Sequence, residues 1–481
     1  MDTAIDAKIK SQIPVRVIYL VVISIFILIA LFMYFYQFRF SLIDDTYITL
    51  TYARNLRDNF AWGFYPNEVV NSATSPLNVW LLALTSIFVR NMEVAAIVLA
   101  TVVAGALLFL LMRLFAVFDR TILGVIAFVL IIFNPLLVSC LGLETLLYIT
   151  IVVACLNLYL SQQTRLLGIA LAMLVLTRSD GALLFLILHA LSPGRRGKLL
   201  KWFLVILLPW YLFSYLALGS LLPVTLFIKT GQAYWETWTF ANGILLYIQH
   251  YPIETITSLL PLIAFVLVIP FAWKKMDGEI LHVITILIAF VIAYYSGYSL
   301  LSVPPYHWYY APPLAILILA GMMAAGLISP YIPWLFVPLS FLGLLIIHAP
   351  GFPLSEAPIH TNWATASGYK QIATELDRLL PSNERIRITG EVGTLAFYSH
   401  TKLCDQFSCR SEYSLTLHNI TNKTLLAAAV LNSPWVINQP IEKSQYEIQK
   451  PMKGKSKVVK EWACSTKWIS LSDLILKDKF P

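Results

Sequence analysis

The residues from Glu93 to Val117 read EVAAIVLATVVAGALLFLLMRLFAV, and Glu93 and Arg113 are the two charged side chains among them. A run of about 20 apolar residues is long enough to cross the hydrocarbon core of a bilayer as a helix. Lipid offers the backbone no hydrogen-bond partners, so such a run must satisfy its own amide groups as a helix. This stretch therefore predicts an integral membrane protein.

The composition of the whole chain agrees with that prediction. Of its 481 residues, 58% are hydrophobic and 12% are charged, and the mean hydropathy is +0.74. Soluble globular proteins carry about 25% charged residues. The net charge of +8 does not indicate nucleic-acid binding, because the lysines and arginines are scattered at segment ends and in the C-terminal tail.

About twelve apolar segments organise the first 350 residues. They lie near 15–37, 75–90, 93–117, 121–139, 143–160, 165–177, 181–193, 199–219, 253–273, 279–300, 311–329 and 331–349. We therefore predict an all-α transmembrane domain of about 11–12 transmembrane segments over 1–350, with a first external loop at about 38–74.

The composition becomes polar from about Gly351 onward. Lys370 to Leu380 has the pattern of a helix stopped by Pro381, and Arg385 to Thr389 alternates as a strand does. These patterns predict a small extracytoplasmic α/β domain over 351–481.

Charge near the segment ends predicts the orientation. Lys8, Lys10 and Arg16 precede the first segment, which we interpret as a signal anchor with a cytoplasmic N-terminus. The clusters Arg195 to Lys201 and Lys274-Lys275 also belong on the cytoplasmic side. Counting from those clusters places the loops at 142–144, 177–180, 229 and 306–310 outside, together with everything after residue 350. One early segment then fails to cross, and the short run at 75–90 is the first candidate.

The first external loop contains an acidic pair, Asp44-Asp45. The residues from Thr46 to Leu56 follow it as an amphipathic helix suited to the membrane surface. One carboxylate can cap that helix while the other stays free to act as a base. Further along the loop, Glu68 is a candidate to face a cleft.

Other ionisable residues lie at the ends of apolar segments on the same predicted face. Glu144, Arg178 and Asp180 are functional candidates, although an ion pair or helix caps explain them equally well. Lys229 suits a lipid phosphate, or else snorkels to the surface. His307 lies in an aromatic block, Tyr306 to Tyr310, typical of a membrane interface, and its ring can also donate to a phosphate.

The sequence gives weaker signals for disulfides and for metal sites than for charged site residues. Cys140 and Cys155 lie in apolar segments as packing residues, and one disulfide among Cys404, Cys409 and Cys464 is left open. The sequence has no metal-ligand spacing. No cofactor is predicted, and a divalent metal is left open.

Several blocks together resemble the GT-C glycosyltransferases, in particular the mycobacterial terminal arabinofuranosyltransferases and their uncharacterised bacterial relatives. The first-loop blocks are Asp44 to Leu56 (DDTYITLTYARNL), Phe64 to Glu68 (FYPNE) and Ala73 to Leu77 (ATSPL). Later blocks are Gly142 to Thr145, Thr177 to Gly181, Pro223 to Lys229, His307 to Pro312, and Gly390 to Thr394 with Asp405 downstream. The chain departs from the family pattern at Thr51, Asn78, Ser179 and Val224, where Arg, Trp, Pro and Asn are usual, and it lacks the Gly between Asn67 and Glu68.

The resemblance implies an inverting transferase that moves a sugar from a polyprenyl-phosphate donor to a hydroxyl of an envelope glycan or glycolipid. The reaction would occur on the periplasmic face of a bacterial inner membrane, with no nucleic-acid partner. Asp44 would be the base and Asp45 its neighbour, which caps the helix or orients the acceptor. The donor phosphate and substrate would be bound by Lys229, His307, Arg178, Glu144, Asp180, Glu68 and Tyr310.

Two other functions remain open from the sequence. A transporter or flippase would also place charges at helix ends, but it should show internal repeats and needs no external acidic pair. A non-catalytic envelope-assembly protein would tolerate Asp44→Asn and Asp45→Asn.

Overall fold

The computed structural model describes residues 19, 21–410, 446–449 and 475–478, with short gaps inside the long range at 224, 233–234, 236, 274–277, 330, 363, 380–384 and 389. Predictions that concern Lys8, Lys10, Arg16, Val224, Lys274, Lys275, Leu380, Pro381, Thr389 and Cys464 therefore lie outside the described residues.

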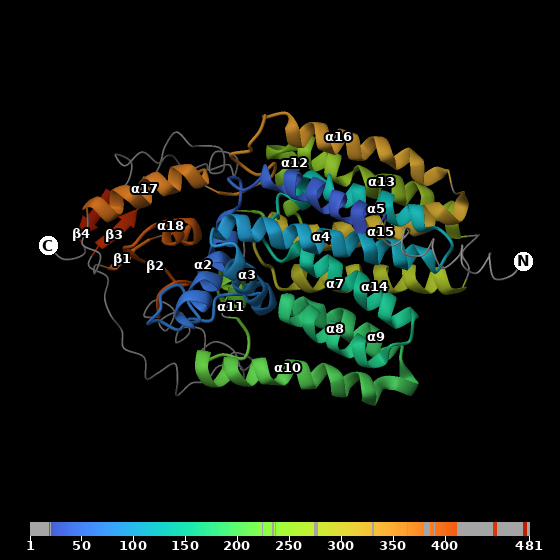
Figure 1. Cartoon of the computed structure of the whole chain (residues 1–481), viewed down its shortest axis with the longest axis horizontal. Helices are drawn as coiled ribbons and strands as arrows, with labels where there is room; N and C mark the ends of the chain where they lie inside the picture. Colours follow the sequence, from blue (N-terminus) through green and yellow to red (C-terminus); the bar gives the residue numbers. More distant parts are fainter. Residues whose placement is uncertain are drawn as a thin grey trace, which may run out of the picture.

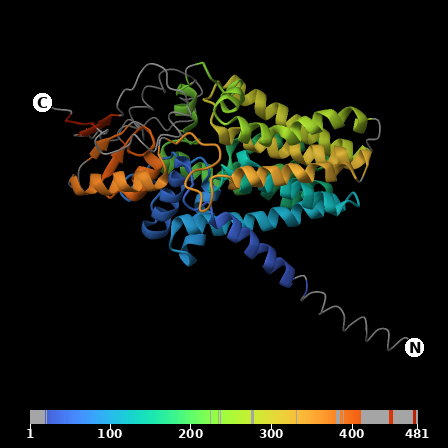
Figure 2. The same cartoon turned by 90° about the horizontal axis from the view of Figure 1, so that it is seen from above.

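The described chain is mostly helical, and its apolar helices run side by side as a bundle (Figure 1). The first apolar helix covers Val21–Tyr36, and its N-terminal half leans away from the bundle with exposed side chains (Figure 2). The other helices of the bundle are α4 (Met92–Ala116), α5 (Thr121–Ile132), α6 (Pro135–Val138), α7 (Thr145–Leu160), α8 (Thr164–Thr177), η1 (Ser179–Gly181), α9 (Ala182–Ala190), η2 (Pro193–Arg195), α10 (Arg196–Leu218), α12 (Gly243–His250), α13 (Pro252–Trp273), α14 (Gly278–Leu300), η3 (His307–Tyr309), α15 (Ala311–Ile328), η4 (Ile332–Phe336) and α16 (Val337–His348).

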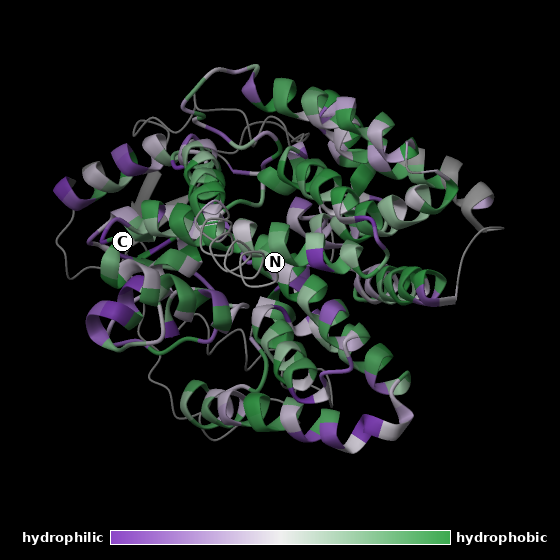
Figure 3. Ribbon diagram, turned by 45° about the vertical axis from the view of Figure 1, so that its right-hand side comes forward, coloured by the Kyte–Doolittle hydropathy of each residue, from purple (hydrophilic) through white to green (hydrophobic). Residues whose placement is uncertain are grey.

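These helices confirm most of the predicted apolar segments. The segment at 121–139 is divided, because the Asn134 side chain accepts the N–H groups of Leu136 and Leu137 and Pro135 begins a new helix there. Four helices in the described part of the chain are long and apolar enough to cross a membrane: Met92–Ala116, Pro193–Leu218, Gly278–Leu300 and His307–Ile328. Hydrophobic residues dominate the bundle, and polar residues gather at helix ends and at the end of the molecule where the C-terminus lies (Figure 3).

A second layer lies at one end of the bundle and contains α2 (Asp44–Asn59), α3 (Pro76–Phe88) and α11 (Thr225–Gln232) (Figure 1). Helix α3 has 13 residues and rises about 20 Å, less than a membrane span requires. The segment at 75–90 is therefore short, as predicted. Helices α5, α8 and α9 are short as well, so length alone does not identify the segment that fails to cross.

The C-terminal segment packs against this layer with α17 (Ala366–Leu379), α18 (Val392–Tyr398) and the short strands β1 (Arg385–Arg387), β2 (Lys402–Cys404), β3 (Tyr446–Gln449) and β4 (Ile475–Asp478). The sheet order is β2-β1-β3-β4, with the last pair antiparallel and the other pairs parallel. A hydrophobic core joins α2 to this segment through Tyr47, Leu50, Tyr369, Ile386 and Leu403. The first loop and the C-terminal segment thus form one packed unit.

Two predictions about α2 are wrong. The helix begins at Asp44 rather than near Thr46, and its N-cap is Ile43, so neither carboxylate caps it. The apolar side chains Tyr47, Leu50 and Tyr52 are buried against α3 and the C-terminal segment instead of facing lipid. A periodic apolar face identifies a surface to be buried, but it does not identify what covers that surface.

Candidate functional site

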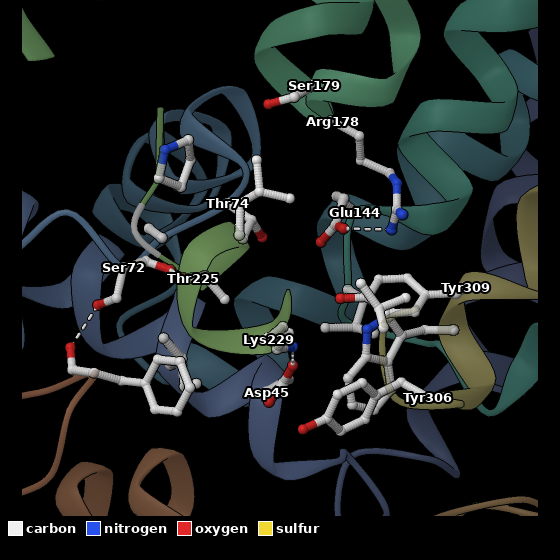
Figure 4. Close-up of a pocket in the computed structure, with 18 of the residues that line it drawn as sticks. Asp45, Ser72, Thr74, Glu144, Arg178, Ser179, Thr225, Lys229, Tyr306 and Tyr309 are labelled. Carbon is white, nitrogen blue, oxygen red and sulfur yellow. Dashed lines mark hydrogen bonds and ion pairs between the residues drawn. The ribbon is translucent and has the colours of Figure 1, made fainter. Parts of the chain in front are cut away.

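A cavity of about 550 Å³ lies where the bundle, the second layer (α2, α3 and α11) and the C-terminal segment meet (Figure 4). Its wall includes the acidic pair on α2, residues at the start of α7, the junction of α8 with η1, α11 and the end of α14. The stretches at 361–362, 390–392 and 405–407 contribute residues from the C-terminal side. Segments far apart in the sequence therefore line one space.

Asp44 is the more buried member of the acidic pair. Its side chain accepts hydrogen bonds from the backbone N–H groups of Thr394 (2.6 Å to Oδ1) and Gly393 (3.2 Å to Oδ2), and its own N–H donates to Asn362 Oδ1 at 3.2 Å. Burial raises the pKa of Asp44, and the charge of Asp45 raises it as well, whereas the two N–H groups lower it. The resulting pKa is about 7. A carboxyl group with a pKa near 7 can accept a proton at neutral pH.

Asp45 lies beside Asp44 but has a different partner. Its Oδ2 is 3.0 Å from the ammonium of Lys229 on α11 (Figure 4). That ammonium also lies 4.4 Å from the ring centroid of Tyr306 and 5.0 Å from that of Trp308, within cation–π range. The pair brings α11 to the N-terminal end of α2 and sets a cation at the cavity wall.

Arg178 anchors a buried polar network on the other side of the cavity. It lies 3.1 Å from Glu144 and 2.9 Å from Asp180, and its guanidinium also donates to the hydroxyls of Tyr294 and Tyr298. Tyr298 in turn donates to Asp180 at 2.6 Å. Among the described residues, the cavity wall has two cations, Arg178 and Lys229, and both are ion-paired in this structure.

One wall of the cavity is apolar. Ala182 and Leu183 from α9, Leu226 from α11, Gly297 from α14 and Leu301 directly after α14 line it. Helices α9 and α14 belong to the bundle, whose residues are mostly hydrophobic (Figure 3). The cavity thus combines a charged end and an apolar side.

Three predicted site residues do not reach the cavity. Glu68 pairs with Arg385 at 2.6 Å and Lys402 at 3.2 Å, and so fastens the first loop to the C-terminal segment. His307 is fully buried beside the rings of Tyr247 and Trp308.

Tyr310 is also buried, because its ring stacks on Phe240 and its hydroxyl donates to the Phe240 carbonyl at 2.6 Å. The neighbours Tyr306, Trp308 and Tyr309 line the cavity in its place. A short 3₁₀ helix sends successive side chains in different directions, so an aromatic block does not reveal which members face a site.

The sequence did not single out Asn362, Tyr294 or Tyr298. Asn362 has no motif around it, and the two tyrosines belong to an apolar segment, where they are typical of packing or of an interface belt. Four-residue spacing on one helix places Tyr294 and Tyr298 on the same face. The signal in the sequence that could have identified the two tyrosines was this spacing, together with the predicted position of Arg178 at the end of another apolar segment.

Cys404 and Cys409 form a disulfide, which settles one of the pairings that the sequence left open. The loop that they close contributes Asp405 and Phe407 to the cavity wall, and Ser72 Oγ of the first loop donates to the Phe407 carbonyl at 2.6 Å.

Within the described residues, no group of three or more His, Cys, Asp or Glu side chains is arranged to hold a metal ion.

Comparison with known proteins gives a fold relationship. No protein-family model matches the chain, and no curated protein sequence matches it. Its fold is similar to that of ArnT from Cupriavidus metallidurans bound to undecaprenyl phosphate, with a TM-score of 0.57 at 12% identity over 90% of this chain and 93% of that chain. The apo structure of the same protein gives a TM-score of 0.54 at 13% identity over 81% of this chain and 86% of that chain. The shared fold is that of a multi-pass membrane protein.

Proposed function

We propose that this chain is an inverting glycosyltransferase that moves a sugar from a polyprenyl-phosphate donor to a hydroxyl of an envelope glycan or glycolipid. The observation that carries the proposal is the cavity itself. The wall of one cavity combines a buried carboxylate, Asp44, an ammonium, Lys229, and apolar residues from the bundle helices α9 and α14. This combination suits a base, a phosphate and a lipid chain.

The donor would place its phosphate beside Lys229 and its lipid chain along the apolar wall. Phosphate oxygens form strong charge-assisted hydrogen bonds with an ammonium. Because Lys229 is already paired with Asp45, the phosphate replaces that carboxylate as its partner. Arg178 stays in its network with Glu144 and Asp180, whose carboxylates offset its charge. The similarity to ArnT, whose structure contains undecaprenyl phosphate, supports a donor of this class.

The reaction would be a single displacement. The acceptor oxygen attacks the anomeric carbon, the bond from that carbon to the phosphate oxygen breaks, and the phosphate leaves with the electron pair. Asp44 takes the proton of the acceptor hydroxyl, since a neutral hydroxyl is a weak nucleophile. Lys229 stabilises the charge that grows on the leaving phosphate. Asp45, released from Lys229, is free to hold the acceptor.

A periplasmic location is supported by two features that do not depend on each other. The charge distribution predicts that the C-terminal segment is outside, and that segment contains the Cys404–Cys409 disulfide. Disulfides persist in oxidising compartments such as the bacterial periplasm. We therefore propose an inner-membrane enzyme with a cytoplasmic N-terminus and a periplasmic active site.

Mass spectrometry of lipid-phosphate sugars and envelope glycans from a deletion strain tests the function. The strain is expected to accumulate one polyprenyl-phosphate sugar and to lack that sugar in a glycan or glycolipid. The wild-type chain should restore both, and Lys229→Met should not, because losing a hydrogen bond to a charged group costs about 10- to 100-fold in affinity. Lys370→Met, at an exposed position of α17, is the matched control. Unchanged lipid and glycan profiles in the deletion strain would contradict the proposal.

The orientation gives a separate prediction. A cysteine introduced by Gln371→Cys on the exposed face of α17 should react with an impermeant maleimide in intact spheroplasts. Gln163→Cys, between α7 and α8, should react only after permeabilisation. Both changes are made with Cys464→Ser; Cys140 and Cys155 are buried, and Cys404 and Cys409 are bonded to each other. Protection of Gln371→Cys in intact spheroplasts would show that the C-terminal segment is not periplasmic.

A further inference from the structure

The carboxylate of Asp44 is held by residues that lie more than 300 positions later in the chain. Gly393 and Thr394 donate to its two oxygens, and Asn362 accepts its backbone N–H; these partners are 349, 350 and 318 residues away. No helix of the bundle takes part in these three contacts. The C-terminal segment therefore forms the immediate surroundings of the proposed base.

The approach of Gly393 is too close for any other residue. A Cβ atom at this position would lie 2.2 Å from the Asp44 carbonyl oxygen and 2.9 Å from Ile48 Cγ1. The first of these contacts is with backbone, which cannot rotate away as a side chain can. Glycine thus allows α18 to bring two consecutive N–H groups against one carboxylate.

The turn before α18 is also specialised. Gly390 has φ +80°, and Glu391 has φ +56°, a left-handed conformation that is uncommon for a residue with a side chain. The Tyr369 hydroxyl donates to Glu391 Oε2 at 2.7 Å and so ties the turn to α17. An unusual turn is stable only when its surroundings hold it in place, and α17 does so here.

We propose that the loop from Gly390 to Thr394 is a positioning element, which fixes the Asp44 carboxylate in the cavity and completes the active site only when the C-terminal segment is docked on α2. This inference rests on the proposed function, because it assigns the loop a role toward the base of that reaction. The C-terminal segment is then part of the catalytic unit. The residues of the loop act through Asp44 and are not themselves catalytic.

The charged groups around Asp44 predict what loss of the loop would do. Asp45 on the same helix opposes ionisation of Asp44, and Lys229 on α11 is already paired with Asp45. Glu391, on the loop itself, is a further carboxyl group at the cavity, and Tyr47 of α2 lies close enough to feel the charge of Asp44. Because the Gly393 and Thr394 N–H groups stabilise the carboxylate form, their removal would make Asp44 harder to ionise.

Gly393→Ala in the full-length, detergent-purified chain tests the inference through two measurements. The first is the pH dependence of sugar transfer from the polyprenyl-phosphate sugar identified in the deletion strain. The second is labelling of Asp44 by dicyclohexylcarbodiimide, which reacts with protonated carboxyl groups in apolar sites, followed by peptide mass spectrometry. Both midpoints are expected to move upward by about one pH unit. At neutral pH the turnover should fall about fivefold, because a rise of one unit from about 7 leaves about a tenth of Asp44 deprotonated at pH 7 instead of half, and it should recover at alkaline pH.

Two further variants keep the result interpretable. Gly197→Ala is the matched control, because a Cβ there has open space and the position lies on α10, outside the site. Tyr369→Phe removes the hydroxyl that holds Glu391 while keeping the ring, so it should shift both midpoints in the same direction. It serves as the test if Gly393→Ala does not fold.

Unshifted midpoints in folded Gly393→Ala, or in Tyr369→Phe should the glycine variant not fold, would overturn the positioning role even if turnover fell. A wild-type chain that transfers no sugar would instead overturn the proposed function, and the labelling midpoints of Asp44 would still decide whether the loop acts on this carboxylate.

Discussion

Asp44→Asn is expected to lower the rate of sugar transfer about 10²- to 10⁴-fold while leaving donor binding nearly intact. The amide has the shape of the carboxylate, and its oxygen can still accept the Thr394 N–H, but it cannot take a proton from the acceptor hydroxyl. In the proposed mechanism the donor phosphate is bound by Lys229, which does not contact Asp44 through any hydrogen bond that we observe among the described residues. The loss should therefore appear in turnover and not in donor affinity.

Single-turnover assays with purified protein, together with binding of polyprenyl phosphate, separate these quantities. The wild-type rate should rise between pH 6 and 8 with a midpoint of about 7, because only the deprotonated Asp44 accepts a proton and burial raises its pKa to about 7. Asp44→Asn should lose this rise along with the activity. Asp45→Asn is the informative comparison, since it removes the neighbouring charge and the Lys229 partner without removing the proposed base.

The pattern across the two variants decides the assignment. Near-normal turnover of Asp44→Asn beside an inactive Asp45→Asn would show that the base is Asp45. Full activity in both variants would remove the enzyme mechanism altogether, as a non-catalytic assembly protein would tolerate both changes. An inactive Asp44→Asn that also fails to bind donor would indicate a structural loss instead of a chemical one.

The sequence predicted what depends on local chemistry. Most apolar helices followed from hydropathy, but the break at Asn134-Pro135, where a cap and a missing N–H end one helix and start the next, was not predicted within the segment at 121–139. The acidic pair was found because two adjacent carboxylates in an external loop require an explanation. The charges at the ends of apolar helices, Glu144, Arg178 and Asp180, were found because ionisable groups are costly there.

The sequence did not predict what depends on contacts between distant segments. Glu68 was expected in a cleft, yet its charge is neutralised by Arg385 and Lys402 of the C-terminal segment, and no local pattern encodes that partnership. The apolar face of α2 was assigned to lipid because periodicity does not distinguish lipid from protein. The motif from Gly390 to Thr394 was noted as a resemblance, but its position against Asp44 required the structure.

Arg178→Met is expected to destabilise the protein by about 3–5 kcal/mol, because it leaves buried carboxylates without their cation. Glu144 and Asp180 are both ion-paired to Arg178, and each of the three side chains is at most 9% exposed. Methionine approximates the length of the arginine stem and restores none of its hydrogen bonds. In detergent, with unfolding monitored by tryptophan fluorescence, the variant should melt at a markedly lower temperature than the wild type. Alternatively, it should fail to yield monodisperse protein.

A triple variant separates lost charge balance from lost packing. Arg178→Met combined with Glu144→Gln and Asp180→Asn removes all three charges together, so no uncompensated ion remains and much of the lost stability should return. Arg113→Gln, at an exposed position near the end of α4, is the control and should melt as the wild type does. If the single variant is as stable as this control, the network is not a structural ion cluster. If the triple variant is no more stable than the single one, packing and the tyrosine hydrogen bonds, not charge balance, account for the loss.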